Sequence, residues 1–203
     1  MTLYLVTGGA GFIGSHLATA LAGRGDRVRL LDDLTTGSLE NVAHLDPGEL
    51  GSGAPVELVR GSVADSEAAR AACEGVTGVF HEAAQVSVPQ SVQDPVRSYE
   101  INVTGTLRML EAAREAGVET FVFAASSAAY GESEELPKVE TMTPQPCSPY
   151  ASGKVAGEHL LSVYGRVHGM RTVSLRYFNI FGPRQADDSP YTGVIAIFAK
   201  ALL

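Results

Sequence analysis

Tyr150 and Lys154 lie one helical turn apart in the run Tyr150-Ala151-Ser152-Gly153-Lys154, and this spacing places both side chains on one face of a helix. A phenol with a pKa near 10 is a poor base at neutral pH, so it needs a neighbour that stabilises the phenolate. Lowering that pKa by about 3 units, worth about 4 kcal/mol, is a task to which a lysine ammonium can contribute. The same pair also fits an exposed tyrosine beside a solvated lysine.

A serine hydroxyl closes a predicted strand in the run Ala124-Ala125-Ser126-Ser127. Such a hydroxyl can donate a hydrogen bond to an alkoxide or ketone oxygen and pass a proton to a nearby base, so Ser126 is a candidate partner of Tyr150. Ser127 is a rival for this role, and either serine could instead cap the turn after the strand.

Glycines cluster between the first predicted strand and the first predicted helix, at Gly8, Gly9, Gly11 and Gly14. Glycine lets the backbone turn tightly and approach a pyrophosphate with no Cβ in the way, and the helix N-terminus adds free N–H groups. This position in the chain indicates a dinucleotide-binding turn. Such a site needs no basic side chain, which fits an acidic protein.

An acidic pair, Asp32 and Asp33, ends the second predicted strand. Asp32 follows Gly14 at close to the roughly 20 residues expected of the acid that binds an adenosine ribose. A carboxylate accepts hydrogen bonds from both ribose hydroxyls but repels a 2′-phosphate, and no arginine directly follows Asp33. The pair therefore favours NAD over NADP, the alternative being a glycine turn with an acidic helix cap.

Short apolar runs alternate with stretches of helical period along the chain. The predicted strands are residues 3–6, 28–31, 56–59, 78–80, 120–124 and 172–177, and the predicted helices include residues 12–22, 96–116 and 149–168. This order predicts an α/β fold with a doubly wound parallel sheet of the Rossmann type. The carboxyl ends of its central strands line a ligand crevice, and Ser126 and Tyr150 both follow the fifth strand.

Three other segments have a distinct composition. Residues 46–55 and 131–149 are rich in Gly, Pro or acidic residues and are predicted to be surface loops. Residues 194–203 form an apolar run that is predicted to be a last helix.

Charge and composition exclude several classes of protein. The chain of 203 residues has a formal net charge of −8, so we expect neither nucleic acid nor an anionic membrane as a partner. Cys73 and Cys147 have neither a disulfide nor a metal-site spacing, which predicts free thiols in a reducing cytoplasm and no metal site. The sequence shows no basic leader and no apolar stretch near the roughly 18 residues of a membrane span, so we expect a soluble, cytoplasmic protein.

Taken together, these motifs resemble the NAD-dependent epimerase/dehydratase family of extended short-chain dehydrogenases. The resemblance covers essentially the whole chain and extends to residues 81–89, 102–106 and 176–184. Within the family, the motifs are most similar to those of UDP-hexose 4-epimerases. The resemblance implies NAD as cofactor, a UDP-sugar as substrate and a homodimer formed through the long helices.

The resemblance also implies a role for each matching residue. Tyr150 would be the base, Lys154 would bond the nicotinamide ribose, and Ser126 would bond the 4-oxygen of the sugar. Asn102 would mainly link its helix to the core. The implied cofactor contacts are Gly8, Gly11, Phe12, Ile13, Gly14, Asp32, Asp33, Ser62, Val63, Ala83, Ala84, Gln85, Asn102, Tyr150, Lys154 and Phe178. The implied substrate contacts are Ser87, Ser126, Tyr150 and Asn179.

Three departures from the family pattern stand out. Ser62 occupies the place of an Asp that usually binds the adenine amino group, so we expect adenine binding to be weaker or to use the backbone. Glu82 replaces a usually apolar or amide residue, and the sequence offers no physical account of it. The family also continues well past residue 203. We therefore expect residues 1–180 to form the NAD-binding domain with the catalytic residues, and residues 181–203 to begin a largely absent substrate-binding region.

The reaction implied by the resemblance is inversion at carbon 4 of a UDP-sugar through a transient 4-keto sugar. One alternative is an NAD-binding module without catalytic competence, because much of the wall that would hold UDP is missing. Another is a dehydratase, a decarboxylase or a one-way oxidoreductase on the same scaffold. Ser127 and Ala128 stand where the related 4,6-dehydratases typically have Asp and Glu, which disfavours dehydration. The sequence does not identify the sugar.

Overall fold

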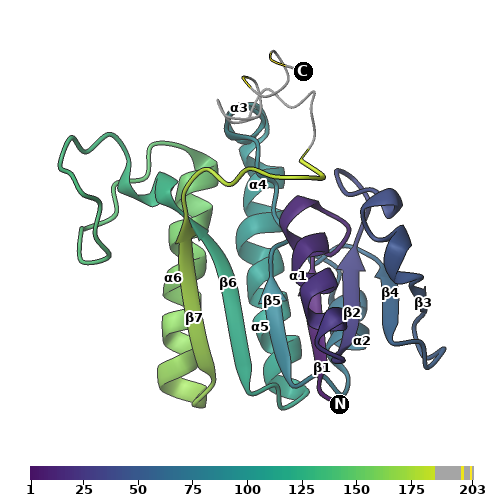
Figure 1. The fold of residues 1–203 in the computed structure, drawn as a ribbon. Helices are drawn as coiled ribbons and strands as arrows, with labels where there is room; N and C mark the ends of the chain where they lie inside the picture. The colour runs from purple at the N-terminus through teal and green to yellow at the C-terminus, as the bar shows by residue number, and fades with distance from the viewer. Residues whose placement is uncertain (186–197, 199–201, 203) are drawn as a thin grey trace.

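The computed structural model describes residues 1–185, 198 and 202. In this part of the chain, seven strands form one parallel sheet in the order β3-β4-β2-β1-β5-β6-β7 (Figure 1). The strands are β1 (Leu3–Thr7), β2 (Arg27–Asp32), β3 (Gly48–Glu49), β4 (Val56–Arg60), β5 (Gly78–His81), β6 (Thr120–Ser126) and β7 (Arg171–Tyr177).

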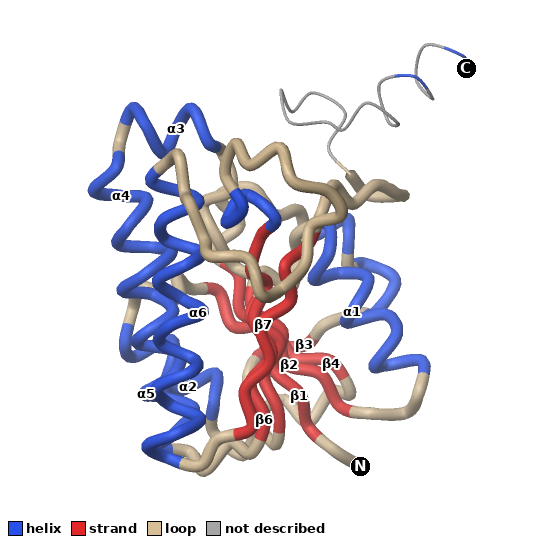
Figure 2. Tube along the Cα trace, turned by 90° about the vertical axis from the view of Figure 1, so that its left-hand side faces the viewer, coloured by secondary structure: helices blue, strands red, loops and turns tan. Residues whose placement is uncertain are grey.

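Helices cover both faces of this sheet (Figure 2). One face carries α1 (Phe12–Gly23), and the other carries α2 (Ser66–Cys73), α5 (Thr106–Glu115) and α6 (Pro149–His168). Three short pieces precede α5: α3 (Val88–Gln93), α4 (Pro95–Tyr99) and the π-helical segment η3 (Glu100–Gly105). Single 3₁₀ turns are η1 (Leu39–Asn41), η2 (Ala43–Leu45) and η4 (Ser127–Tyr130). The predicted α/β, doubly wound fold is confirmed.

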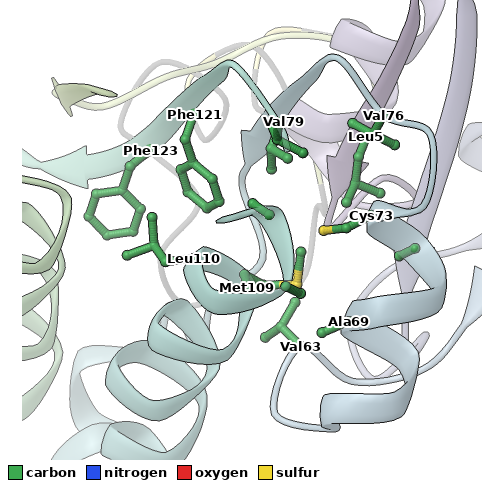
Figure 3. Close-up of a cluster of buried hydrophobic side chains, with 14 of the residues drawn as sticks. Leu5, Val63, Ala69, Cys73, Val76, Val79, Met109, Leu110, Phe121 and Phe123 are labelled. Atoms are coloured by element: carbon green, nitrogen blue, oxygen red, sulfur yellow. The ribbon is translucent and has the colours of Figure 1, made fainter. Parts of the chain in front are cut away.

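The sheet is buried on both faces because its central strands carry apolar side chains at successive positions. Leu5 and Val6 are neighbours on β1 and are both fully buried, yet they point to opposite faces. Leu5 packs in the core under α2 and α5, which also holds Val79, Met109 and Phe121 (Figure 3). Val6 packs in the core under α1. The two cores fix β1 at the centre of the molecule.

The strand order sets the place of the ligand crevice. The chain passes from β1 to β2 and β4 on one side of β1, then returns to β5 on its other side. In open sheets of this kind, such a reversal marks the ligand-binding crevice, which is expected here at the carboxyl ends of β1 and β5. The glycine turn follows β1, and the segment from Glu82 to Gln85 follows β5.

Some elements differ from the sequence-based prediction. The helix predicted at residues 96–116 is divided into α4, η3 and α5. The segment 46–55, predicted as a loop, contains β3, which pairs with Glu57 and Leu58 of β4. Residues 131–148 lack regular structure, as predicted, and α6 begins at Pro149. Most of the predicted helix at 194–203 lies outside the described residues.

Candidate active site

The backbone of the glycine turn packs so closely that two of its positions leave no room for a Cβ. Gly8 has a φ of +63°, and a Cβ there would lie 2.9 Å from the backbone nitrogen of Ala83. A Cβ on Gly14 would collide with the carbonyl of Gly8. Helix α1 starts at Phe12 with Gly11 as its N-cap and no side-chain cap, so the N–H groups of its first turn are available to an anion. The turn fits the pyrophosphate of a dinucleotide.

Asp32 joins this turn to the end of β2. Its Oδ2 accepts a hydrogen bond from the Ala10 N–H at 2.9 Å, and its Oδ1 accepts one from the Leu34 N–H at 2.8 Å. Burial raises the pKa of this carboxyl, while the two backbone N–H groups act in the opposite direction. Asp33 is exposed and accepts a hydrogen bond from the Thr35 N–H. The structure thus brings Asp32 against the glycine turn and leaves Asp33 toward solvent.

Asn102 fixes the backbone on the other side of the crevice. Its Oδ1 accepts a hydrogen bond from the Gln85 N–H at 2.9 Å, and its Nδ2 donates one to the Gln85 carbonyl at 3.0 Å. The side chain is 2% exposed. Asn102 lies in η3, so this π-helical segment is tied directly to Gln85, one of the predicted cofactor contacts.

A buried histidine links the same segments through a directed chain of hydrogen bonds. Thr106 donates its hydroxyl proton to the Asn102 carbonyl, so it must accept from His81 Nε2–H at 3.1 Å. His81 Nδ1 then accepts from the Thr7 hydroxyl at 2.8 Å, and Thr7 Oγ1 accepts from the Ala83 N–H. Complete burial lowers the pKa of His81 to about 3. His81 is therefore a neutral structural link, a role that its place at the end of an apolar strand could have suggested.

Tyr150, Lys154 and Ser126 come together at the carboxyl end of β6. Burial raises the pKa of the Tyr150 phenol, and a hydrogen bond with the Ser126 hydroxyl acts to lower it. Lys154 is 3% exposed, and its Nζ donates to the Ala124 carbonyl at 2.7 Å. Burial lowers the pKa of Lys154 to about 8. Its Nζ lies 5.9 Å from the centre of the Tyr150 ring.

Ser126 caps the turn after β6 and also interacts with Tyr150. Besides its hydrogen bond with Tyr150, its Oγ accepts from the Ala128 N–H at 3.1 Å and so caps η4. Its rival, Ser127, belongs to η4 itself. The geometry therefore favours Ser126 as the hydroxyl that acts with Tyr150.

Three predicted contact residues have local structural roles. Val63 is 4% exposed and packs in the core, so only its backbone is available to a ligand. Ser62 Oγ accepts a hydrogen bond from the Ala64 N–H at 3.2 Å. Ser87 is buried and caps α3 by accepting from the Gln90 N–H at 3.2 Å.

Phe178 and Asn179 follow β7 and are exposed. The ring of Phe178 stacks on that of Tyr130, with the ring centres 6.2 Å apart. The guanidinium of Arg176 lies over the ring of Tyr130, 4.9 Å from its centre. The same guanidinium donates two hydrogen bonds of 2.8 Å to Glu158. This packing orients the start of the segment that leaves the sheet.

Residues 178–184, which we term the bridge, cross above the carboxyl ends of the strands from β7 toward α1 (Figure 1). Arg184 anchors the far end of the bridge: its Nη2 donates to His16 Nδ1 at 2.7 Å, and its Nη1 donates to the Asn41 carbonyl at 2.9 Å. His16 Nε2 donates in turn to the Pro183 carbonyl. Arg184 could not be identified as an anchor from the sequence, because its partners are distant along the chain.

In the described part of the chain, no group of three or more His, Cys, Asp or Glu side chains could hold a metal ion. Among these residues, no helix is both long and apolar enough to cross a membrane. Cys73 is buried and Cys147 is exposed, and both are free thiols.

Known proteins are similar to this chain in sequence and in fold. Residues 4–203 match the family described as the NAD dependent epimerase/dehydratase family. The UDP-glucose 4-epimerase of Mycolicibacterium smegmatis is 41% identical over 201 residues, which are 98% of this chain and 62% of that protein. The chain thus spans less than two thirds of the length of this relative.

Two solved structures illustrate the range of activities on this scaffold. The UDP-glucose 4-epimerase of Thermus thermophilus, solved in complex with NAD, is 46% identical, with a TM-score of 0.84 over 98% of this chain and 61% of that one. The dTDP-glucose 4,6-dehydratase DesIV of Streptomyces venezuelae, solved with NAD bound, is 32% identical, with a TM-score of 0.86 over 99% of this chain and 62% of that one. The sequence match and the shared fold together show that this chain belongs to the NAD dependent epimerase/dehydratase family, whose cofactor is NAD.

Proposed function

We propose that this chain binds NAD along the glycine turn and supports inversion at carbon 4 of a UDP-sugar. The observation that carries the proposal is the grouping of Tyr150, Ser126 and Lys154 at the carboxyl end of β6. The match to UDP-glucose 4-epimerases supports the choice of reaction.

The residues around the crevice fit NAD. Gly8 and Gly14 leave room where a Cβ would strike backbone, and the uncapped start of α1 offers N–H donors to a pyrophosphate. Asp32 ends β2 beside this turn, where its carboxylate can accept hydrogen bonds from the adenosine ribose. When bound, NAD supplies a hydride acceptor for carbon 4 of the sugar.

The side chains at the carboxyl end of β6 would transfer the proton of the sugar 4-hydroxyl. Tyr150 takes the proton of the 4-hydroxyl and returns it after the intermediate 4-keto sugar has turned over, while Ser126 donates a hydrogen bond to the 4-oxygen. Because burial raises the pKa of Tyr150, the phenolate needs added positive charge. Lys154 provides that charge from α6, with its Nζ 5.9 Å from the centre of the phenol ring.

A dehydratase is the second candidate, because the DesIV structure superposes well on this chain. The local residues disfavour it. Ser127 and Ala128 follow Ser126 on η4 and supply neither a carboxylic acid nor a carboxylate base. Elimination of water needs both an acid and a base, so this end of β6 is better suited to epimerisation.

The assembly and the domain division stay predictions. We propose a homodimer through α4, α5 and α6, supported by the exposed apolar side chains Val96, Tyr99, Leu107, Val163 and Val167 on these helices. We also propose that residues 1–180 form the NAD-binding domain and that residues 181–203 begin the substrate-binding region.

The first experiment combines cofactor release with turnover. The purified chain is denatured, the released NAD is quantified, and the native sample is assayed for interconversion of UDP-glucose and UDP-galactose. Bound NAD together with interconversion is expected. Bound NAD without interconversion would favour a cofactor-binding module or another sugar, and a preparation that neither retains nor takes up NAD would overturn the proposal.

A further inference from the structure

Glu82 places a carboxylate next to the proposed catalytic lysine. It follows His81, whose partner across the sheet is Phe123 of β6. Lys154 Nζ bonds to the carbonyl of Ala124, the residue after Phe123, and lies 4.9 Å from the centre of the Phe123 ring. In this parallel register Glu82 follows on to the level of Ala124, whose carbonyl holds the lysine. Neighbouring parallel strands are about 4.8 Å apart.

The carboxylate of Glu82 is incompletely satisfied. Its Oε1 accepts a hydrogen bond from the Tyr177 hydroxyl at 3.3 Å, while its Oε2 is buried and has no hydrogen-bond partner among the described residues. A buried oxygen without a partner costs free energy, so its retention calls for a compensating interaction. Burial raises the pKa of Glu82, while the charge of Lys154 and the hydrogen bond with Tyr177 act to lower it, so the ammonium of Lys154 offers such compensation.

The surroundings of Lys154 contain few other charges. Tyr150 lies on the same helix, His81 and Phe123 face the amine from β5 and β6, and Tyr177 reaches Glu82 from β7. His81 is neutral because burial lowers its pKa to about 3. Glu158, one turn further along α6, is paired with Arg176. Among the residues that the structure describes, Glu82 is thus the carboxylate that acts on Lys154.

We propose that Glu82 is a positioning residue, held by Tyr177, whose carboxylate serves as the buried counter-charge that keeps Lys154 in its ammonium form at neutral pH. This accounts for an acid where the family pattern has an apolar or amide residue. Its importance for turnover rests on the proposed function, because the ammonium would stabilise the Tyr150 phenolate. The electrostatic coupling itself does not depend on any substrate.

The pKa of Lys154 tests this proposal without turnover. The chain contains three lysines, Lys138, Lys154 and Lys200, so a protein labelled with ¹³C at lysine Cε gives few signals, which the single variants K138R and K200R assign. We expect Lys154 of the unaltered chain to titrate near pH 8. Glu82→Gln should lower that midpoint by about 1 pH unit, since an opposite charge at close range typically contributes 1–3 units.

Two variants separate charge from structure. Glu82→Leu removes both the charge and the hydrogen bond with Tyr177, and it should shift Lys154 in the same direction as Glu82→Gln. Glu134→Gln removes an exposed acid from the loop after η4 and should leave the titration unchanged. Near-UV circular dichroism establishes that each variant is folded. A Lys154 midpoint that is the same in folded Glu82→Gln or Glu82→Leu as in the unaltered chain would overturn the proposal, because Glu82 would then carry no charge there.

Failure of this inference can be told apart from failure of the proposed function. In an active enzyme, Glu82→Gln should move the alkaline limb of the pH–rate profile to lower pH by the same interval as the Lys154 signal. A shifted signal in a protein that epimerises no sugar would retain the coupling and reject the function. Turnover with an unshifted signal would retain the function and reject the coupling.

Discussion

The phenol of Tyr150 is bracketed by a hydroxyl on β6 and an ammonium on its own helix, and the two act on it in different ways. Ser126 forms a hydrogen bond with it, whereas Lys154 is held away from bonding distance by the Ala124 carbonyl. In the proposed function Lys154 would act on Tyr150 as a charge, and a base at this position would then depend on the protonation state of the lysine.

Replacing the phenol should separate chemistry from cofactor binding. We expect Tyr150→Phe to retain NAD and to lose about 10²–10⁴-fold in kcat, the range associated with a positioned general base. Released NAD and the rate of UDP-sugar interconversion are measured on the same preparation. Tyr4→Phe, on β1 with its ring against Phe80, serves as the matched control and should keep full activity. Substantial epimerisation by Tyr150→Phe would remove Tyr150 from its role as base.

At the scale of single residues, spacing along the sequence was enough to predict that the three candidate catalytic residues lie on a helix and at the end of a strand. Tyr150 and Lys154 share a helix and Ser126 ends a strand, so local rules place them. The surroundings of Glu82 could not be predicted, because Tyr177 is brought to it by the pairing of β6 with β7. A single sequence does not give the side-chain partners that long-range pairing creates.

Among the elements, η3 departs from the continuous helix that periodicity predicts. Periodicity predicted one helix over residues 96–116, but the segment Glu100–Gly105 is π-helical and presents Asn102 to the backbone of Gln85. Departures of this kind in helices are frequent at functional sites. Periodicity could not reveal it, because over so few residues the apolar spacing of a π-helical turn is close to that of an α-helical turn.

The two hydrogen bonds between Asn102 and the Gln85 backbone can be tested by removing only the Asn102 N–H donor. We expect Asn102→Asp to lower the free energy of unfolding by about 1–3 kcal/mol, because the Gln85 carbonyl loses its donor and faces a buried carboxylate. Urea denaturation measures the change. Asn179→Asp, at an exposed position, should change it by less than about 0.5 kcal/mol. An equal effect of the two substitutions would show that Asn102 does not hold the segment after β5.

Across the whole molecule, alternation of strand and helix was sufficient to predict the doubly wound sheet. The central strands were predictable because they are buried on both faces and read as apolar runs. β3 was not, since its two residues, Gly48 and Glu49, carry no strand signal and owe their pairing to β4. The same burial places His81 at the centre of the fold, where its titration affects the stability of the entire chain.

His81 should make the protein sensitive to mild acid. Its pKa is about 3 in the folded chain and 6.5 ordinarily, so the unfolded chain binds the extra proton and stability falls as the pH drops below 6.5. Between pH 7 and pH 5.5 the loss should be about 1 kcal/mol. Urea denaturation at both pH values measures it. His81→Gln should abolish most of this difference, whereas exposed His159→Gln should preserve it. Equal pH dependence in His81→Gln and the unaltered chain would contradict the assignment.

The bridge has a consequence for the time that a ligand spends in the crevice. Residues 178–184 are fixed at one end by β7 and at the other by the contacts of Arg184 with His16 and Asn41, and they pass over the carboxyl ends of the strands (Figure 1). A dinucleotide lying along the glycine turn would be enclosed by this segment, so its escape would wait for the Arg184 end to detach. Residence time would then be governed by the breaking of a protein contact, independently of how tightly the dinucleotide itself is held.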